Sequence, residues 1–345
     1  MEEYINCLKK ELKQKHEKVC DNYNITTIYI GGGTPSFIDS KYIQELLEMI
    51  QTNENTEITI EVNPGTVNKQ KLIDYKKAEI NRLSIGLQTT SNTLLKQIGR
   101  IHTFEEILET YNLAREVGFK NINVDLMLGL PNQKVDDLKT SLENVLSLQP
   151  EHISMYSLIL EEGTKLYSLI NNKKLNLPNE KLERQMYWYV KNTLELNGYK
   201  HYEISNFAKS GFESKHNVNC WKQKEYLGVG LAASSYIGNI RYSNIADLNK
   251  YMANIEAGEF TKNKVIEEVQ NKEEMQKEYM MLGLRIIDGI SIQEFKNKFM
   301  KNPIYLFKKE LNKLTNENLI IVDGDRIKLT NKGLDLANQV WCEFC

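Results

Sequence analysis

The sequence predicts an α/β fold in which a partial parallel (β/α) barrel is followed by an α+β region and a small C-terminal module. Short runs rich in β-branched residues recur through the first half of the chain, with amphipathic helical stretches between them. This alternation is typical of a parallel sheet. The pattern changes after Glu161 and again near residue 266. We therefore divide the chain into three parts: 1–165, 166–265 and 266–345.

Five strands are predicted for the barrel. They begin at Ile25, Glu57, Arg82, Asn121 and His152. Helical stretches between them cover residues 40–53, the segment after Thr103, and residues 135–148. Thr103 and Glu106 have the spacing of a capping box, in which each side chain accepts a hydrogen bond from the backbone of the other.

The chain opens with a helix, because Ile5, Leu8 and Leu12 recur at helical spacing. A helix that leads into a first parallel strand normally follows a strand of its own. The predicted sheet would therefore begin with an exposed edge, which proteins usually avoid.

The middle part is predicted to hold one long helix over residues 180–196, capped at its start by Asn179. A glycine- and aromatic-rich stretch over residues 199–242 follows, and it shows no helical pattern. We assign this region to family-specific structure of mixed α+β type.

The C-terminal part is predicted to contain helices followed by a hairpin that turns at Asp323-Gly324-Asp325. The helices cover residues 273–286, 291–299 and 304–314. This order resembles a winged helix. Residues 266–345 carry 12 basic and 13 acidic side chains, a net charge of −1. A DNA-reading wing would be basic, so a packing role is favoured.

Composition excludes several classes of protein. The 345 residues have a net charge of −2, which argues against binding to nucleic acid or anionic membrane by bulk charge. No apolar run approaches membrane-spanning length, and the acidic N-terminus has no signal-peptide core. Five scattered cysteines do not make a secreted disulfide scaffold. A cytoplasmic protein is expected, with no prediction for its oligomeric state.

The carboxyl ends of the predicted strands carry polar residues, and in parallel barrels ligands bind at these ends. The first strand ends in Gly31-Gly32-Gly33-Thr34-Pro35, where three glycines let a ligand approach the backbone. Neither a P-loop nor a dinucleotide-binding fingerprint is present. The later ends carry Glu61, Gln88, Asp125 and Tyr156. Together these residues predict a pocket.

Gly31–Pro35, directly after an apolar strand, resembles the methionine-contacting glycine motif of radical S-adenosylmethionine enzymes. The other motifs resemble the branch related to oxygen-independent coproporphyrinogen III oxidase, and specifically its heme-chaperone members. They follow in order at Glu61–Pro64, Leu83–Gln88, Gly99–His102, Asn123–Pro131 and Tyr202–Ala208. The resemblance runs almost end to end.

This resemblance implies a binding site for S-adenosylmethionine. Gly32, Gly33 and Thr34 would hold its methionine amino group. The rest of the cofactor would be contacted by Glu61, Gln88, Arg100 and Asp125. The residue types agree, because Asp can accept from ribose hydroxyls and Arg offers a planar fork to a carboxylate. A structural alternative stays open for Arg100, which could cap a helix or pair with Glu105.

A second motif, His216-Asn217-Val218-Asn219-Cys220-Trp221, resembles the signature of the heme-chaperone members, with Cys220 where tyrosine is usual. His216 is the candidate heme ligand, and Trp221 and Tyr226 could form an apolar shelf beside it. A structural histidine, or a Cys220 that is only a small buried hydrophobe, remains an alternative. Ser234 replaces a family histidine downstream.

The resemblance implies a first barrel strand followed by a cysteine loop that holds the [4Fe–4S] cluster. Both are absent from the sequence, so the barrel is predicted to lack its first strand. Cys7 and Cys20 do not have the spacing of that loop, and Cys342 and Cys345 lie on a terminal tail with too few ligands. Two explanations compete: Met1 is an internal methionine of a longer native chain, or the protein is a cluster-less relative. The intact pocket motifs favour the first. The chain as given is expected to be inactive in radical chemistry.

Three functions are therefore considered. The leading hypothesis is a heme chaperone whose partners are heme or porphyrin and a heme-acceptor protein. The second is an oxygen-independent coproporphyrinogen III dehydrogenase. The third is a winged-helix nucleic-acid-binding regulator, which the near-neutral charge of residues 266–345 speaks against.

Overall fold

The computed structural model describes residues 1–19 and 22–345, so Cys20 lies outside the described residues. The chain forms two compact units. The barrel unit comprises Thr27–Gln44 and Asn55–Glu213. The terminal unit comprises Met1–Thr26, Glu45–Glu54 and Ser214–Cys345. The division of the sequence at residues 165 and 265 stays a prediction.

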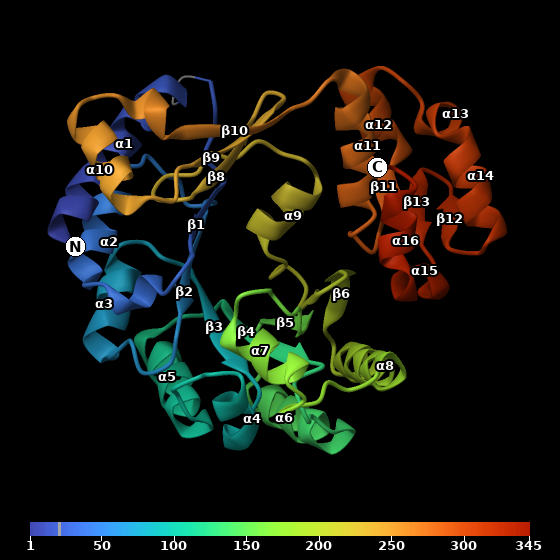
Figure 1. Ribbon diagram of the computed structural model, residues 1–345, viewed down its shortest axis with the longest axis horizontal. Helices are drawn as coiled ribbons and strands as arrows, with labels where there is room; N and C mark the ends of the chain where they lie inside the picture. The colour runs from blue at the N-terminus through green and yellow to red at the C-terminus, as the bar shows by residue number, and fades with distance from the viewer. Residues whose placement is uncertain (20–21) are drawn as a thin grey trace. The chain divides into compact units, whose positions relative to one another are not determined.

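Within the described residues, the barrel unit is built on a seven-stranded sheet that forms part of a barrel. Five parallel strands lie side by side in chain order (Figure 1): β1 (Thr27–Ile30), β2 (Glu57–Val62), β3 (Arg82–Gln88), β4 (Ile122–Leu128) and β5 (His152–Ser157). Beside β5, β7 (Asn206–Ala208) and β6 (Lys200–Glu203) continue the sheet as antiparallel strands. The predicted α/β class and the five strands are confirmed.

Helices connect the parallel strands: α2 (Ser40–Leu47), α3 (Lys69–Lys77), α4 (Asn92–Gln97), α5 (Phe104–Val117) and α6 (Val135–Leu148). The capping box of α5 is confirmed, because Thr103 and Glu106 exchange both hydrogen bonds. The helix predicted over residues 40–53 is shorter. Beyond Leu47 the backbone N–H groups of Met49 and Ile50 bond three residues back, so the chain tightens into a turn.

After β5 the barrel unit continues with α7 (Lys165–Asn171) and α8 (Glu180–Leu196). Asn179 caps α8 by accepting a hydrogen bond from the N–H of Leu182, 2.9 Å away, as predicted. The outer face of the sheet is apolar and buried. Helix α5 packs on β3, and α6 and α8 pack on β4. Its buried side chains include Ile58, Ile60, Leu83, Ile85, Val124 and Leu126.

The terminal unit combines α1 (Glu2–Val19) with elements from the second half of the chain. Helix α1 contacts α10 (Leu248–Glu256). A three-stranded antiparallel sheet is formed by β8 (Ser234–Ile237), β9 (Ile240–Asn244) and β10 (Lys264–Val269), with the short turn η2 (Phe260–Asn263) before β10. Helix α9 (Lys215–Trp221) lies in the stretch for which the sequence showed no helix. It is short, and Ser214 caps it by accepting from the N–H of Asn217.

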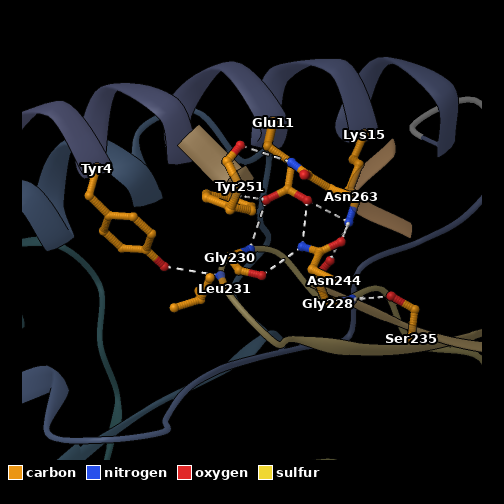
Figure 2. Close-up of polar contacts among 10 residues, drawn as sticks. All are labelled: Tyr4, Glu11, Lys15, Gly228, Gly230, Leu231, Ser235, Asn244, Tyr251 and Asn263. Atoms are coloured by element: carbon orange, nitrogen blue, oxygen red, sulfur yellow. Dashed lines mark hydrogen bonds and ion pairs between the residues drawn. The ribbon is translucent and has the colours of Figure 1, made fainter. Parts of the chain in front are cut away.

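The buried carboxylate of Glu11 joins α1 to the glycine-rich segment 228–236 (Figure 2). It accepts from the N–H of Gly230 at 2.8 Å and from the hydroxyl of Tyr251 at 2.6 Å. It also accepts from the amide of Asn244 at 2.7 Å and forms an ion pair with Lys15 at 2.8 Å. A Cβ on Gly230 would lie 3.0 Å from the Tyr4 hydroxyl. The glycine here therefore permits close packing against α1.

The elements from α11 (Lys272–Gly283) to the end of the chain, called the C-terminal module below, have a core of their own. After α11 the module contains α12 (Ile292–Phe299), α13 (Pro303–Leu306) and α14 (Lys308–Asn316), then the predicted hairpin. The hairpin strands are β12 (Ile320–Asp323) and β13 (Arg326–Leu329), joined by β11 (Ile290–Ser291) and followed by α15 (Asn331–Asp335) and α16 (Ala337–Cys342). Its core includes Tyr279, Phe295, Phe299, Phe307, Ile327 and Phe344. Nowhere in the described ranges is a helix long and apolar enough to cross a membrane.

Candidate functional site

The inner face of the parallel sheet is polar, which is unusual because parallel sheets are normally apolar on both faces. Side chains alternate along each strand, so residues two apart share a face. Strand register places Thr59 beside Arg82, and Glu61 beside Ser84. In the described part of the chain, the buried Thr59 Oγ1 and Arg82 Nε have no hydrogen-bond partner. A face of this kind is suited to a polar ligand.

The glycine turn after β1 has one closed and two open positions. A Cβ on Gly31 would lie 2.6 Å from the Tyr29 ring and 2.9 Å from Glu61 Oε1. Gly32 and Gly33 have φ angles of +84° and +57°, and an added Cβ on either would meet nothing within 4 Å. Their backbone is thus exposed in a left-handed conformation that glycine adopts readily. The backbone of Gly32 and Gly33 is therefore accessible to a ligand.

Glu61 lies on β2 directly beside this turn. Its carboxylate accepts from the Tyr29 hydroxyl at 2.9 Å and from the N–H of Gly32 at 3.2 Å. Burial and the charge of Glu61 raise the pKa of Tyr29, so that phenol stays protonated as a donor. The predicted residues Gly32 and Glu61 are therefore in direct contact.

Thr34 is fixed by a second set of contacts. The side-chain amide of Asn63 donates to Thr34 Oγ1 at 3.0 Å, and the N–H of Asn63 donates to Ser36 Oγ at 3.1 Å. Ser36 and Thr66 share a hydrogen bond of 2.7 Å. These bonds fasten the turn η1 (Pro35–Phe37) to the segment that follows β2.

Lys71 on α3 holds together η1 and the segment that follows β2. Its ammonium donates to the carbonyls of Ser36 at 2.8 Å, Thr66 at 3.1 Å and Phe37 at 3.4 Å. Burial lowers the pKa of Lys71, and the nearby charge of Asp39 opposes that shift. Nothing in the sequence marks Lys71 as part of a site, because it lies in an ordinary helical stretch more than thirty residues from the glycines.

Gln88 and Arg100 occupy the end of β3 and the loop after α4. Gln88 is buried with a φ of +70°, and its amide lies close to Gly86, as does the side chain of Asn63. Glu105 accepts from Asn92 at 3.1 Å, and no ion pair joins Glu105 to Arg100 in the part of the chain that the structure describes. The charge of Arg100, after burial, contributes to a lowered pKa of His102.

Asp125 lies on β4 within a buried polar network. The amide of Asn123 donates to Asp125 and to Ser84, each at 2.8 Å. Burial raises the pKa of Asp125 to about 6, although hydrogen bonds from Asn123 and Ser154 and the charge of Arg82 act in the opposite direction. The charge of Glu61 adds to the increase. Glu61 and Asp125 thus act on one another across the inner face.

His152 completes this network at the start of β5. Its Nδ1 donates to Asn123 Oδ1 at 2.6 Å, and its Nε2 accepts from the Tyr202 hydroxyl at 2.8 Å. Burial holds the pKa of His152 well below its ordinary value, so the imidazole is neutral. In the sequence, His152 is recognisable only as the start of a strand, and nothing there predicts its role in fixing Asn123.

The candidate heme-binding residues lie in the terminal unit, on α9. His216 Nε2 and Cys220 Sγ are 3.9 Å apart, one turn from each other, and both residues are half-buried. Burial raises the pKa of the Cys220 thiol. Trp221 and Tyr226 are engaged elsewhere: Trp221 stacks on Arg285, and the Tyr226 hydroxyl accepts from Arg241. Ser234 is exposed on β8.

The cysteines are dispersed. Cys7 is buried between α1 and α10, where burial and a hydrogen bond to Glu256 raise its pKa to about 11. Cys342 and Cys345 are exposed on the terminal tail. Among the described residues, no group of three or more His, Cys, Asp or Glu side chains is arranged to hold a metal ion.

Comparison with known proteins shows which family the chain is similar to. The model of the Radical SAM superfamily matches residues 8–145, and that of the HemN C-terminal domain matches residues 270–336. The chain is 38% identical to the heme chaperone HemW of Lactococcus lactis over 324 residues, covering 93% of this chain and 84% of that protein. The chain belongs to the heme chaperone HemW family. Identity to Bacillus subtilis HemW is 37% over 349 residues, covering 100% and 91% of the two chains.

The fold has a solved counterpart. Coproporphyrinogen III oxidase (HemN) from Escherichia coli, described as a radical SAM enzyme, superposes with a TM-score of 0.85 over 99% of this chain and 82% of that one. At 21% sequence identity this likeness shows the fold alone. Membership in the HemW family confirms the resemblance seen in the sequence motifs, while the roles of the individual site residues stay predictions.

Proposed function

We propose that this HemW-family protein carries heme on α9 and binds S-adenosylmethionine on the inner face of the barrel unit. The observation that carries the heme proposal is the His216–Cys220 pair, which presents two heme-ligand atoms on one face of a short helix. A heme-acceptor protein would be the partner that receives the cargo. The cytoplasmic location expected from the sequence remains a proposal.

Replacing His216 by alanine is expected to weaken heme binding by about tenfold or more, because the imidazole is the proposed iron ligand. Titration with hemin, followed by the Soret band, measures both affinity and ligation. His16→Ala on α1 is the matched control and should bind like the wild type. Unchanged affinity and an unchanged spectrum in His216→Ala would exclude His216 as the ligand.

The barrel residues fit S-adenosylmethionine. The open backbone at Gly32 and Gly33 and the carboxylate of Glu61 suit an ammonium and carboxylate end, and Asp125 suits ribose hydroxyls. The buried polar atoms without partners at Thr59 and Arg82 belong to the same face. Gln88 and Arg100 complete the proposed set. When bound, the cofactor supplies an activated sulfonium group.

The described residues do not fit a [4Fe–4S] cluster, because the cysteines are scattered and no three thiols converge. We therefore assign no radical step to these residues. Two finer features of the fold are also proposals: the barrel lacks the first strand of the radical SAM type, and the C-terminal module is winged-helix-like. The near-neutral charge of that module favours packing over nucleic-acid binding.

Replacing Lys71 by methionine is expected to weaken S-adenosylmethionine binding by about five- to tenfold, because three carbonyls lose their shared donor and the glycine turn loosens. Equilibrium dialysis with the cofactor measures this. Lys69→Met on the same helix removes an exposed ion pair to Glu116 and should change little. Equal cofactor affinity in both variants would show that Lys71 does not support the turn.

A further inference from the structure

Helix α9 ends in an aromatic sandwich. The guanidinium of Arg285, just beyond α11, lies 4.2 Å from the centroid of Trp221 and 4.8 Å from that of Trp341. Trp221 is the last residue of α9, and Trp341 lies on α16 of the C-terminal module. A guanidinium stacked on indole faces is held by cation–π attraction as well as by packing. Trp221 is thus bound to the C-terminal module through Arg285.

A second set of contacts holds the residue that follows the helix cap. Gln223 is buried, with a φ of +50°. Its amide donates to Glu278 at 2.8 Å and to the carbonyl of Met275 at 3.1 Å, both on α11. Lys298 on α12 donates to the side-chain and backbone oxygens of Gln223, each at 3.0 Å. The chain leaving α9 is therefore fixed by two helices of the module.

Glu278 is itself fixed by Arg241 of β9, at 2.7 Å. Arg241 also stacks on Tyr236 at 4.4 Å and donates to the Tyr226 hydroxyl at 3.3 Å. Arg241 therefore connects α11 to Tyr226 and Tyr236, which follow α9 in the chain. These contacts connect the module to β8 and β9 by charged groups that are largely screened from solvent.

These contacts matter because α9 has only seven residues. Isolated helices of that length are not stable in water, so packing must supply the stability of α9. His216 lies five residues before Trp221, which is roughly 7 Å along a helix. Loss of the contacts that hold Trp221 and Gln223 would therefore displace or unwind the turn that carries His216 and Cys220.

We propose that the C-terminal module is the scaffold of α9, and that Arg285 is a positioning residue for His216 and Cys220. Trp221 of the signature motif then anchors α9 and does not serve as an apolar shelf for heme. The proposal rests on the proposed function only where heme is the ligand, because the fixing of α9 is a property of the protein without heme.

Two variants of Arg285 test this in the full chain. Arg285→Leu removes the stacked cation, and Arg285→Lys keeps a cation between the indoles. Lys264→Leu is the control, since Lys264 lies 3.8 Å from the centroid of the Tyr242 ring in the same unit, on β10 and away from α9. Thermal unfolding establishes that each variant is folded.

The first readout is amide hydrogen exchange over residues 215–222 without heme. Exchange in this segment should rise about tenfold in Arg285→Leu, rise by a smaller factor in Arg285→Lys, and stay unchanged in Lys264→Leu. If Arg285→Leu does not fold, the lysine variant alone must show intermediate exchange. Wild-type exchange over α9 in a folded Arg285→Leu protein, or in Arg285→Lys when leucine is not tolerated, would overturn the proposal.

The second readout is hemin titration of the same proteins. Arg285→Leu should bind about three- to tenfold more weakly than wild type and shift the Soret band, because His216 is no longer held in place. If hydrogen exchange responds but His216→Ala leaves heme binding unchanged, the scaffold role stands and the heme assignment fails. If exchange does not respond, the scaffold role fails whatever the heme result.

Discussion

Replacing Glu11 by alanine is expected to destabilise the protein by about 3–5 kcal/mol, the range found when one partner of a buried ion pair is removed. The Glu11 carboxylate is 2% exposed and receives four donors (Figure 2). Two of them, Lys15 and Tyr251, come from helices, and the N–H of Gly230 comes from the glycine-rich segment. Without the carboxylate, these donors lose their acceptor.

The ammonium of Lys15 accounts for much of this cost. It keeps bonds to the carbonyl of Gly228 at 2.8 Å and to Asn244 at 3.3 Å, but it loses its ion pair with Glu11. A cation left in a largely buried position has lost its compensation. Glu11→Gln should cost less, about 1–3 kcal/mol, because the amide oxygen can still accept some of these bonds.

Urea unfolding of Glu11→Ala, Glu11→Gln and wild type measures these differences at neutral pH. Glu3→Ala is the control, because Glu3 is an exposed acid in the first turn of the same helix. The control should lie within about 0.5 kcal/mol of wild type. A loss below about 1 kcal/mol for Glu11→Ala would contradict the view that this network holds α1 to the unit.

Much of the barrel could be predicted from the sequence, because its signals are local. The β-branched runs set the strands, and Thr103 and Asn179 mark helix starts by hydrogen bonds within one turn. Helix α9 could not be predicted in this way. Its stability comes from the contacts of Trp221 and Gln223 with residues more than fifty positions away in sequence, Arg285 and Met275.

In the candidate site, too, only some of the residues could be predicted from the sequence. The glycine turn, Glu61 and Asp125 can be recognised in the sequence, because they are flexible or polar residues at strand ends. The structure places them on one face. The residues that hold them in place cannot be recognised in the sequence. Lys71 and Asn123 act through bonds to carbonyls and side chains of other elements, and their neighbours in sequence give no sign of it.

Replacing Asp125 by asparagine is expected to stabilise the protein at neutral pH by an amount on the order of 2–3 kcal/mol. The pKa of Asp125 is raised from 3.8 to about 6, chiefly by burial. Each pKa unit corresponds to about 1.4 kcal/mol of difference between the two protonation states. The folded protein therefore holds this proton more tightly than the unfolded chain does.

The sign of the pH dependence follows from this difference. Well below pH 3.8, Asp125 is protonated in both states, and the variant and wild type differ least. As the pH rises from about 4 to about 6, the unfolded chain gains its carboxylate before the folded protein does, so wild-type stability falls. Asparagine has no such transition. The advantage of Asp125→Asn should thus grow across this interval and stay constant above it.

Urea unfolding of both proteins between pH 4 and pH 8 measures the effect. Asp74→Asn is a control of opposite sign, because hydrogen bonds from Ser40 and Gln70 lower the pKa of Asp74, so that variant should lose stability relative to wild type as the pH rises. A pH-independent difference between Asp125→Asn and wild type would mean that the carboxyl is not perturbed in the folded protein.

A carboxylate that costs stability at neutral pH needs a compensating use, and ligand sites are where proteins keep such groups. If Asp125 accepts hydrogen bonds from ribose hydroxyls, its charged form is the one that binds S-adenosylmethionine. Asp125→Asn should then be more stable than wild type yet bind the cofactor more weakly at pH 7, by about tenfold. Equilibrium dialysis at pH 5 and pH 7 separates the two effects, since wild-type affinity should rise with pH and variant affinity should not. A variant that gained stability and kept full affinity would remove Asp125 from the site.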